Sequence, residues 1–348
     1  MTNLVFEQWM RSTISITAIT AIFWGISPFL SEKYSARTLY WVWKIILLGW
    51  LIPIRPVWLR VHAVVVGTET NHGANVWIGW GFPVVWGLGA IVIAGRSAFC
   101  QIRFSKFLHR WRGPAGEQWQ MLLENEKKVV DIHRQIDLYS CEKLENPILM
   151  GWIRPTIYIP AKSYSPQQSR LILCHEWTHY KRGDSWWKLI KLMVLVMHWF
   201  NPAAWIMAHQ LEWYCELSCD ENVLRHGDDA ERRCYGKLLL SSSLRQSRQI
   251  PPLSSTLTRG GENMKKRLTR LLDSQSKRNG KWIPSLILLL VLATGGIQVL
   301  AVEQQTDQEL VVYFNSDGEE FVEVGNSDVT GLPEEAIHLL VVLQNLDK

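Results

Sequence analysis

Charged side chains are missing from several long stretches of this 348-residue chain, although 20% of its residues are charged overall. A helix of about 20 apolar residues crosses the hydrocarbon core of a bilayer. Four stretches approach or reach that length, and the second carries one charge, Lys44: Ser12–Ser31, Thr38–Ile54, Val76–Gly95 and Trp282–Val302. They exclude a simple soluble globule. They predict a polytopic α-helical membrane protein with three spans in residues 1–95 and a last span at 282–302.

Other features are also missing. The first stretch lacks an Ala-x-Ala-like cleavage site and is soon followed by the second, which predicts a retained span and not a signal peptide. The chain has no internal repeat and no low-complexity tract, and the Ser-, Pro- and Arg-rich segment Ser241–Thr258 is typical of a flexible linker. None of the six cysteines follows the last span, so a disulfide framework is not expected.

The distribution of charge predicts the orientation. Residues 96–112 contain five basic side chains and no acid, and residues 265–281 contain seven Lys or Arg. Basic flanks lie on the cytoplasmic side of a membrane. Residues 96–281 are therefore predicted to be cytoplasmic, whereas the N-terminus and residues 303–348, with eleven acids and one base, lie outside. The net positive charge of the rest is attributed to topology and anionic membrane lipid, not to nucleic acid.

The segment Cys174–His179 carries the pattern His-Glu-x-x-His. On a helix, His175 and His179 share one face and can bind one Zn²⁺, while Glu176 beside them can act as general base on zinc-bound water. The pattern therefore predicts one catalytic Zn²⁺ per chain.

Helix signals surround this pattern. Ser165 is a favourable N-cap, Pro166 suits the first helical position, and Gln168 completes a capping box. Gly183 is placed to end the helix.

Catalytic zinc keeps three protein ligands and one open position, so a third ligand is required. Glu216 and Asp220 would share a helix face, which allows Glu216 to bind the metal and Asp220 to hold a ligand histidine by its other ring nitrogen. On spacing alone, Glu212 and Glu221 are rival ligands.

Four further side chains fall near these candidates. Cys215 and Cys219 are also four residues apart, which permits a thiolate site, although small buried hydrophobic residues are the more ordinary interpretation. His226 and Tyr235 are candidates for stabilising an oxyanion, on proximity in the sequence only.

A fifth uncharged stretch, Leu192–Leu211, lies between the histidines and Glu216. A single crossing there would separate the candidate ligands across the membrane. Asn201-Pro202 near its middle forbids an unbroken helix. We therefore predict a re-entrant helical hairpin at about 186–211 that packs against the other spans and holds the zinc near the membrane surface.

With these features the sequence resembles the BlaR/MecR-type integral membrane zinc metallopeptidases, a gluzincin family. Four segments carry the resemblance: Asn146–Pro160, Leu171–Asp184, His198–Trp205 and Glu216–Glu221. It implies a cytoplasmic α+β zinc metallopeptidase domain in which a small sheet is backed by the two active-site helices.

The resemblance also implies roles for particular residues. The zinc ligands would be His175, His179 and Glu216, with Glu176 as catalytic base and Asp220 supporting a ligand. A strand over Gly151–Pro160, beginning with Gly151, Trp152, Ile153 and Arg154, would be the edge on which a peptide substrate adds. The substrate would be a protein, such as a winged-helix transcriptional repressor or the chain's own linker, in a signalling pathway of the bacterial inner membrane.

One departure concerns the end of the chain. The antibiotic receptors of this family carry a large penicillin-binding domain outside, whereas only 46 residues follow the last span here, without Ser-x-x-Lys. Sensing of β-lactams by acylation is therefore not expected. Leu310–Phe314 and Glu320–Val324 flank Asn315–Gly318, which predicts a β-hairpin.

Three other functions stay open. A quality-control protease would cut many substrates, whereas a signalling protease would cut one. A receptor or scaffold could keep zinc without catalysis, although it would not need Glu176. A transporter is less consistent with the sequence, because Lys44 is the one charge in the spans.

Overall fold

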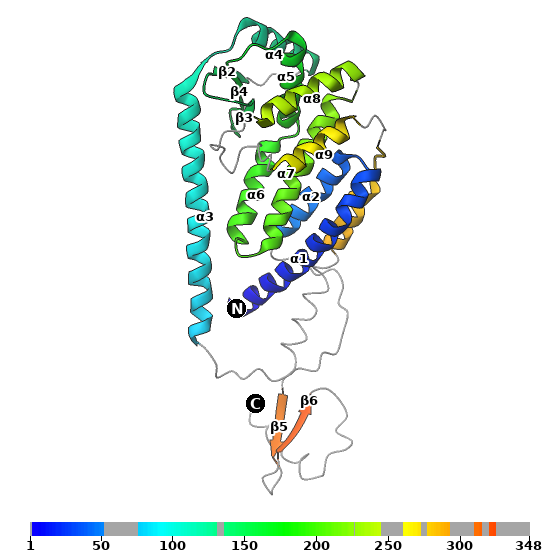
Figure 1. Ribbon diagram of the computed structural model, residues 1–348. Helices are drawn as coiled ribbons and strands as arrows, with labels where there is room; N and C mark the ends of the chain where they lie inside the picture. Colours follow the sequence, from blue (N-terminus) through cyan, green and yellow to red (C-terminus); the bar gives the residue numbers. More distant parts are fainter. Residues whose placement is uncertain are drawn as a thin grey trace. The chain divides into compact units, whose positions relative to one another are not determined.

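Helices dominate the computed structural model, which describes residues 2–51, 76–130, 136–225, 227–244, 260–272, 277–292, 310–314 and 320–324 (Figure 1). The helices are α1 (Thr2–Lys33), α2 (Ala36–Leu51), α3 (Val76–Trp111), α4 (Glu117–Val130), α5 (Pro166–Lys181), α6 (Asp184–Met197), α7 (Pro202–Val223), α8 (Asp229–Leu244) and α9 (Gly260–Leu272). A shorter apolar helix covers Trp282–Leu292. The strands are β1 (Arg112–Pro114), β2 (Asp137–Cys141), β3 (Ile148–Met150), β4 (Thr156–Pro160), β5 (Leu310–Phe314) and β6 (Glu320–Val324).

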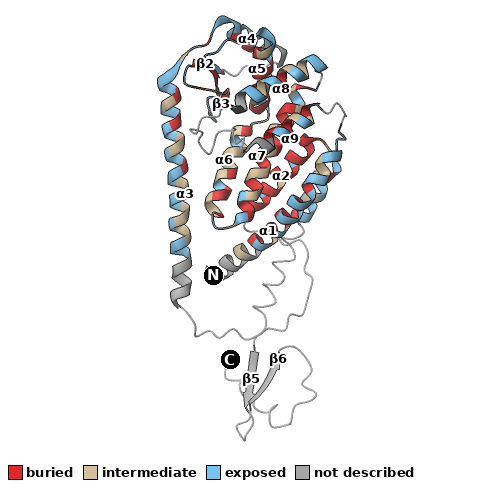
Figure 2. Ribbon diagram, viewed as in Figure 1, coloured by how far each residue is buried: buried red, intermediate tan, exposed pale blue. Residues whose placement is uncertain are grey.

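Two helices in the described residues are long and apolar enough to cross a bilayer, namely Ser12–Lys33 of α1 and Pro83–Trp111 of α3. Both display large apolar side chains, and exposed residues follow α3 along most of its length (Figure 2). Ile91 on α3 is 69% exposed and Phe29 on α1 is 71% exposed. Such surfaces are unfavourable in water and favourable in lipid. The predicted boundary after residue 95 lies inside α3, which continues to Trp111.

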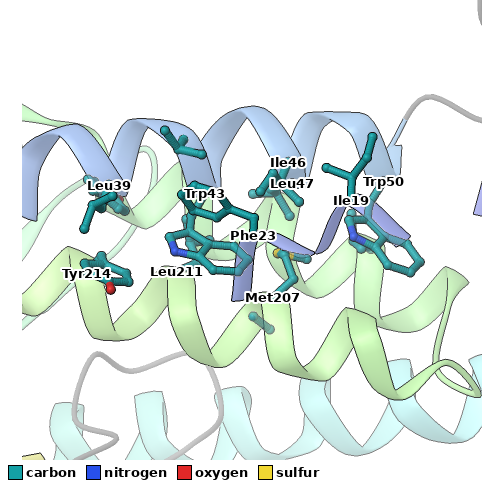
Figure 3. Close-up of a cluster of buried hydrophobic side chains, with 14 of the residues drawn as sticks. Ile19, Phe23, Leu39, Trp43, Ile46, Leu47, Trp50, Met207, Leu211 and Tyr214 are labelled. Carbon is teal, nitrogen blue, oxygen red and sulfur yellow. The ribbon is translucent and has the colours of Figure 1, made fainter. Parts of the chain in front are cut away.

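Helix α2 lies at the centre of the main hydrophobic core (Figure 3). Its side chains pack against α1 and α7; the labelled contacts involve Leu39, Trp43, Ile46, Leu47 and Trp50 of α2, Ile19 and Phe23 of α1, and Met207, Leu211 and Tyr214 of α7. Lys44 of α2 is 3% exposed and lies over the rings of Tyr40, Trp41 and Trp187 at 4.2, 4.8 and 4.6 Å. Cation–π attraction therefore offsets part of the cost of burying its ammonium group.

The predicted hairpin is present as α6, a turn and α7. Asn201 caps α7 by accepting a hydrogen bond from Ala203 N at 2.9 Å, and Pro202 occupies the first position of that helix. Asn201 also donates to Thr17 of α1 at 2.8 Å. Helices α6 and α7 thus pack against α1, α2 and α3, while the re-entrant placement of this hairpin in a membrane stays a prediction.

Tryptophans join α3 to the turn of this hairpin. Trp86 donates to the carbonyl of Met197 at 2.8 Å, and Trp199 donates to the carbonyl of Trp86 at 3.2 Å. The Trp199 ring lies against Gly89, where an added Cβ would be 2.2 Å from the ring. Only glycine permits this approach.

A mixed sheet with the strand order β1-β2-β4-β3 packs against α5 (Figure 1). The pair β2–β4 is parallel, and the two outer pairs are antiparallel. Helices α4 and α5 cover this sheet in a second core, through Trp119, Leu173 and Trp177. The prediction that both active-site helices back the sheet is wrong for α7, because the apolar side chains of α7 pack on α2 in the main core.

The predicted strand over Gly151–Pro160 is also wrong in its first half. Residues 151–154 form the connection between β3 and β4, where Gly151 has φ +100°. That conformation takes the chain out of the extended region, so Trp152, Ile153 and Arg154 are not in a strand. Strand β4 begins at Thr156 and lies inside the sheet, whereas β1 and β3 form its two edges.

Strands β5 and β6 pair in antiparallel register, with Leu310 opposite Val324 and Phe314 opposite Glu320. Their bounds are those predicted from the sequence, so the hairpin is confirmed. Its turn at 315–319 lies outside the described residues.

Candidate metal centre

The first active-site helix begins as the sequence predicts. Ser165 Oγ accepts a hydrogen bond from Gln168 N at 3.2 Å, and Gln168 Oε1 accepts one from Ser165 N at 3.0 Å. Pro166 is the first residue of α5, and Gly183 follows its C-cap with φ +64°. This capping box fixes the register of α5.

Three candidate ligands converge between α5 and α7. The Nε2 atoms of His175 and His179 are 3.2 Å apart. The two carboxylate oxygens of Glu216 each lie 3.6 Å from one of these nitrogens. Two imidazole nitrogens and a carboxylate form the ligand set of a catalytic zinc site that keeps one open position.

The rival carboxylates have other partners. Glu212 forms an ion pair with Lys191 between α6 and α7. Glu221 accepts two hydrogen bonds from Ala36 N, at 2.8 and 3.0 Å, and pairs with Arg270. Glu221 therefore caps the N-terminus of α2. Of the three glutamates considered as third ligand, Glu216 is the one that faces both histidines.

The two cysteines lie beside the histidines in a different geometry. Cys219 Sγ is 3.4 Å from His179 Nδ1 and 3.5 Å from Nε2. Nearly equal distances place the sulfur over the face of the ring, whereas a thiolate that shared a metal ion bound at Nε2 would be much farther from Nδ1. Cys215 Sγ is on the Nδ1 side, 3.8 Å from that nitrogen. This arrangement does not favour the thiolate site considered from the sequence.

His179 is supported by Asp184, whose Oδ2 atom lies 2.7 Å from His179 Nδ1. Asp184 is 1% exposed and also contacts Arg182 at 2.5 Å and the hydroxyl of Tyr40 at 2.7 Å. No sequence pattern singles out these three residues as partners of a histidine. The signal available was the position of Asp184 five residues after His179, but only the fold places Tyr40 of α2 there.

His175 is supported through a chain of hydrogen bonds. Its Nδ1 atom is 2.8 Å from the hydroxyl of Tyr235, and that hydroxyl donates to Asp220 Oδ1 at 2.8 Å. Arg267 donates to both oxygens of Asp220, at 2.8 and 2.9 Å. Tyr235 therefore lies on the Nδ1 side of His175, away from the Nε2 atoms that face each other, which differs from the predicted oxyanion role. His226 lies outside the described residues.

Glu176 lies beside the ligands with one oxygen unused. It is 6% exposed, and its Oε2 atom has no hydrogen-bond partner within the described residues. A buried carboxylate oxygen without a partner is costly. A metal ion with its water would supply that partner, so the donor set and the orphaned oxygen both fit a zinc centre.

Electrostatics hold this donor set together. Burial raises the pKa of the Glu216 carboxyl, but the hydrogen bond to His175 and the charges of His179 and Arg267 outweigh burial, so the pKa lies well below its usual range. Burial lowers the pKa of His179, but its partners Asp184, Cys215 and Glu216 outweigh burial and raise the pKa to about 10. The centre is therefore strongly polarised, with an ionised Glu216 facing both histidines.

The chain is similar in sequence to known proteins. The family model "BlaR1 peptidase M56" matches residues 7–271. Regulatory protein BlaR1 of Bacillus licheniformis is 24% identical over 234 residues, covering 65% of this chain and 39% of that protein. Methicillin resistance mecR1 protein of Staphylococcus aureus is 26% identical over 160 residues, which cover 44% of this chain and 27% of that protein. Regulatory protein BlaR1 of Staphylococcus aureus is 22% identical over 317 residues, which cover 79% of this chain and 52% of that protein. The chain thus spans about a quarter to a half of the length of these relatives.

Proposed function

Because this chain belongs to the BlaR1 peptidase M56 family, we propose that it is a zinc endopeptidase of the bacterial inner membrane. Its centre faces the cytoplasm, with the N-terminus and the tail outside. It hydrolyses peptide bonds in a protein at or near that membrane face. The observation that carries the proposal is the convergence of His175, His179 and Glu216 next to the unpartnered oxygen of Glu176.

Each residue of the centre has a defined task in this proposal. His175, His179 and Glu216 would hold Zn²⁺, which when bound polarises a carbonyl group and acidifies water. Glu176 takes a proton from the attacking water and returns it to the leaving amine. Asp184, and Tyr235 with Asp220, fix the tautomers of the two histidines so that both Nε2 lone pairs face inward.

The proposed role is signalling. A winged-helix repressor, or the chain's own segment Ser241–Arg259, is the substrate we propose on the basis of family resemblance. The first four residues of that segment, 241–244, belong to α8 and are not the linker predicted from the sequence. Two of the relatives are called regulatory proteins, which supports a regulatory role. A dedicated role predicts one main substrate, whereas a quality-control protease would cut many.

The test uses the full chain in nanodiscs, as wild type, Glu176→Gln, and the control Glu142→Gln, whose side chain is exposed on the surface. All three should bind about one zinc per chain. Wild type and the control should produce new N-termini in themselves or in a cytoplasmic extract. We expect Glu176→Gln to reduce that cleavage by about 10²–10⁴-fold, which is the usual contribution of a general base.

Absence of zinc from the wild type would contradict the ligand assignment. Equal cleavage by wild type and Glu176→Gln would contradict the assignment of the base. Zinc binding without cleavage by any of the three proteins would favour the scaffold over the peptidase.

A further inference from the structure

Behind the metal centre the structure contains a basic cavity of about 400 Å³. It lies between the start of α2, the end of α7, α8, α9 and the segment that precedes helix Trp282–Leu292. Six cationic side chains line it: Arg37, Arg225, Arg232, Arg267, Arg270 and Lys277. The acidic residues in its lining are Asp220 and Glu221, so the positive charges exceed the negative charges by four.

Both acids of the lining are already neutralised. Asp220 accepts two hydrogen bonds from Arg267, and Glu221 pairs with Arg270. Their charges therefore cannot offset those of the other four cations.

The remaining cations differ in how they are held. Arg232 donates to the backbone carbonyls of Leu271 and Leu224, and Lys277 donates to the carbonyl of Glu32. The side chains of Arg37 and Arg225 are exposed at the rim and make no hydrogen bond or ion pair within the described part of the chain. Two guanidinium groups thus remain available at the mouth of a cavity whose wall is already positive.

Like charges confined in one cavity repel each other, and an anion relieves that repulsion. A guanidinium group binds phosphate oxygens through paired N–H donors and hydrates weakly, so arginine suits this anion better than lysine does. The proposed peptide hydrolysis uses none of the rim residues. We propose that the basic cavity is a binding site for a phosphate group.

The cavity's position favours the phosphate of an anionic membrane lipid. Arg37 lies just after the link between α1 and α2, and Lys277 lies five residues before helix Trp282–Leu292. Each is near the end of an apolar helix, at the side proposed to be cytoplasmic, where anionic headgroups attract basic residues. This choice of source rests on the proposed membrane orientation, whereas phosphate binding itself does not.

The experiment measures binding to the full chain, and it requires no peptidase activity. Native mass spectrometry and calorimetry in detergent compare inorganic phosphate, short-chain phosphatidylglycerol and short-chain phosphatidylcholine. The test variant is Arg37→Gln/Arg225→Gln, and Arg37→Gln alone is the milder second variant. The control Arg103→Gln/Arg233→Gln removes two exposed arginine charges outside the cavity. Zinc content and thermal unfolding establish that each variant is folded.

We expect the double variant to weaken binding by at least about tenfold, because it removes two charge-assisted contacts. The single variant should weaken binding less and in the same direction, and the control should match the wild type. Loss of phosphatidylglycerol binding with no detectable phosphate binding supports a lipid headgroup site. Loss of both supports a site that accepts either source.

Unchanged affinity in both cavity variants would overturn the proposal. Equal weakening in the control would also overturn it, because the attraction would then be a general effect of surface charge. Tighter binding of phosphatidylcholine than of phosphatidylglycerol would contradict the anionic character assigned to the ligand.

Discussion

Each candidate ligand histidine is held at Nδ1 by a partner from another part of the fold. Asp184 follows α5 and holds His179, while Tyr235 of α8 holds His175. Such contacts fix the ring and its tautomer, and they increase the basicity of the ligand nitrogen. The proposed centre would therefore depend on side chains that do not bind the metal themselves.

Tyr235→Phe tests this dependence. The substitution keeps the ring and removes the hydroxyl that links His175 to Asp220, so zinc affinity should fall by about 10–100-fold. Competition with a chelator measures that affinity. Tyr139→Phe is the matched control, because the Tyr139 hydroxyl makes no hydrogen bond within the described residues. Equal affinities of Tyr235→Phe and wild type would show that the link is not needed.

A second pair of variants distinguishes the rival ligands. Glu216→Ala removes a proposed ligand and should cost zinc affinity more than the change expected for a supporting residue, about 100-fold or greater. Glu212→Ala breaks the ion pair with Lys191 and should destabilise the hairpin while zinc is retained. Metal content and thermal unfolding measure the two effects separately. Loss of zinc in Glu212→Ala but not in Glu216→Ala would reverse the assignment.

At the residue scale, the sequence predicted site residues only where they lie close together in the chain. The spacing of His175 and His179 and the capping box are local patterns, since helix geometry determines them within a few residues. Tyr40 and Arg267 lie far from both histidines in the chain, and no local pattern connects them. Their roles follow from tertiary packing, which a single sequence does not reveal.

At the scale of the elements, α3 packs closely against the turn between α6 and α7, where Gly89 contacts the ring of Trp199. An alanine at position 89 would place Cβ 2.2 Å from the Trp199 ring, so that ring would have to move. We expect Gly89→Ala to destabilise the protein by about 1–3 kcal/mol, as overpacking usually does.

Gly87→Ala is the control on the same helix, because an added Cβ there meets nothing within 4 Å. It should be neutral or slightly stabilising, since alanine favours helices more than glycine does. Thermal unfolding in a fixed detergent compares the two variants. Equal stabilities would show that Trp199 adjusts without cost.

Helix boundaries were predicted correctly where capping side chains and prolines mark them. Ser165 and Pro166 mark the start of α5, and Asn201-Pro202 marks the break between α6 and α7, as the structure confirms. The strand over residues 151–160 was predicted incorrectly because a glycine can serve an extended segment or a turn with positive φ. The partner of α7 was also missed, since an apolar helix face does not indicate which element covers it.

At the scale of the whole molecule, the metal centre and the predicted spans are not separable. The described residues between Thr13 and Leu292 cluster as one unit, and α2 supplies both the core of the bundle and the hydroxyl that contacts Asp184. The predicted domain bounds at residues 95 and 281 were drawn from the distribution of charge along the chain. The packing and hydrogen-bond contacts of α2 with α6 and α7 cross these bounds.

The fragment 96–281 should therefore fail to fold as a soluble zinc protein. Removal of α1 and α2 exposes the apolar faces of α6 and α7 and removes Tyr40. We expect this fragment to aggregate or to require detergent, with little bound zinc at concentrations that saturate the full chain. Size-exclusion chromatography and metal analysis measure both properties. A monomeric fragment with full zinc affinity would contradict this prediction.

The same network has a consequence for biosynthesis. Tyr40, near the beginning of the chain, and Arg267, after the linker, both support the centre. Ribosomes deliver these residues at different times, and the contacts between them have a large sequence separation, which makes assembly slow. The centre therefore cannot be complete until α9 has emerged from the ribosome. A protease able to cut its own nascent chain would thus stay inactive until α9 had been made and folded.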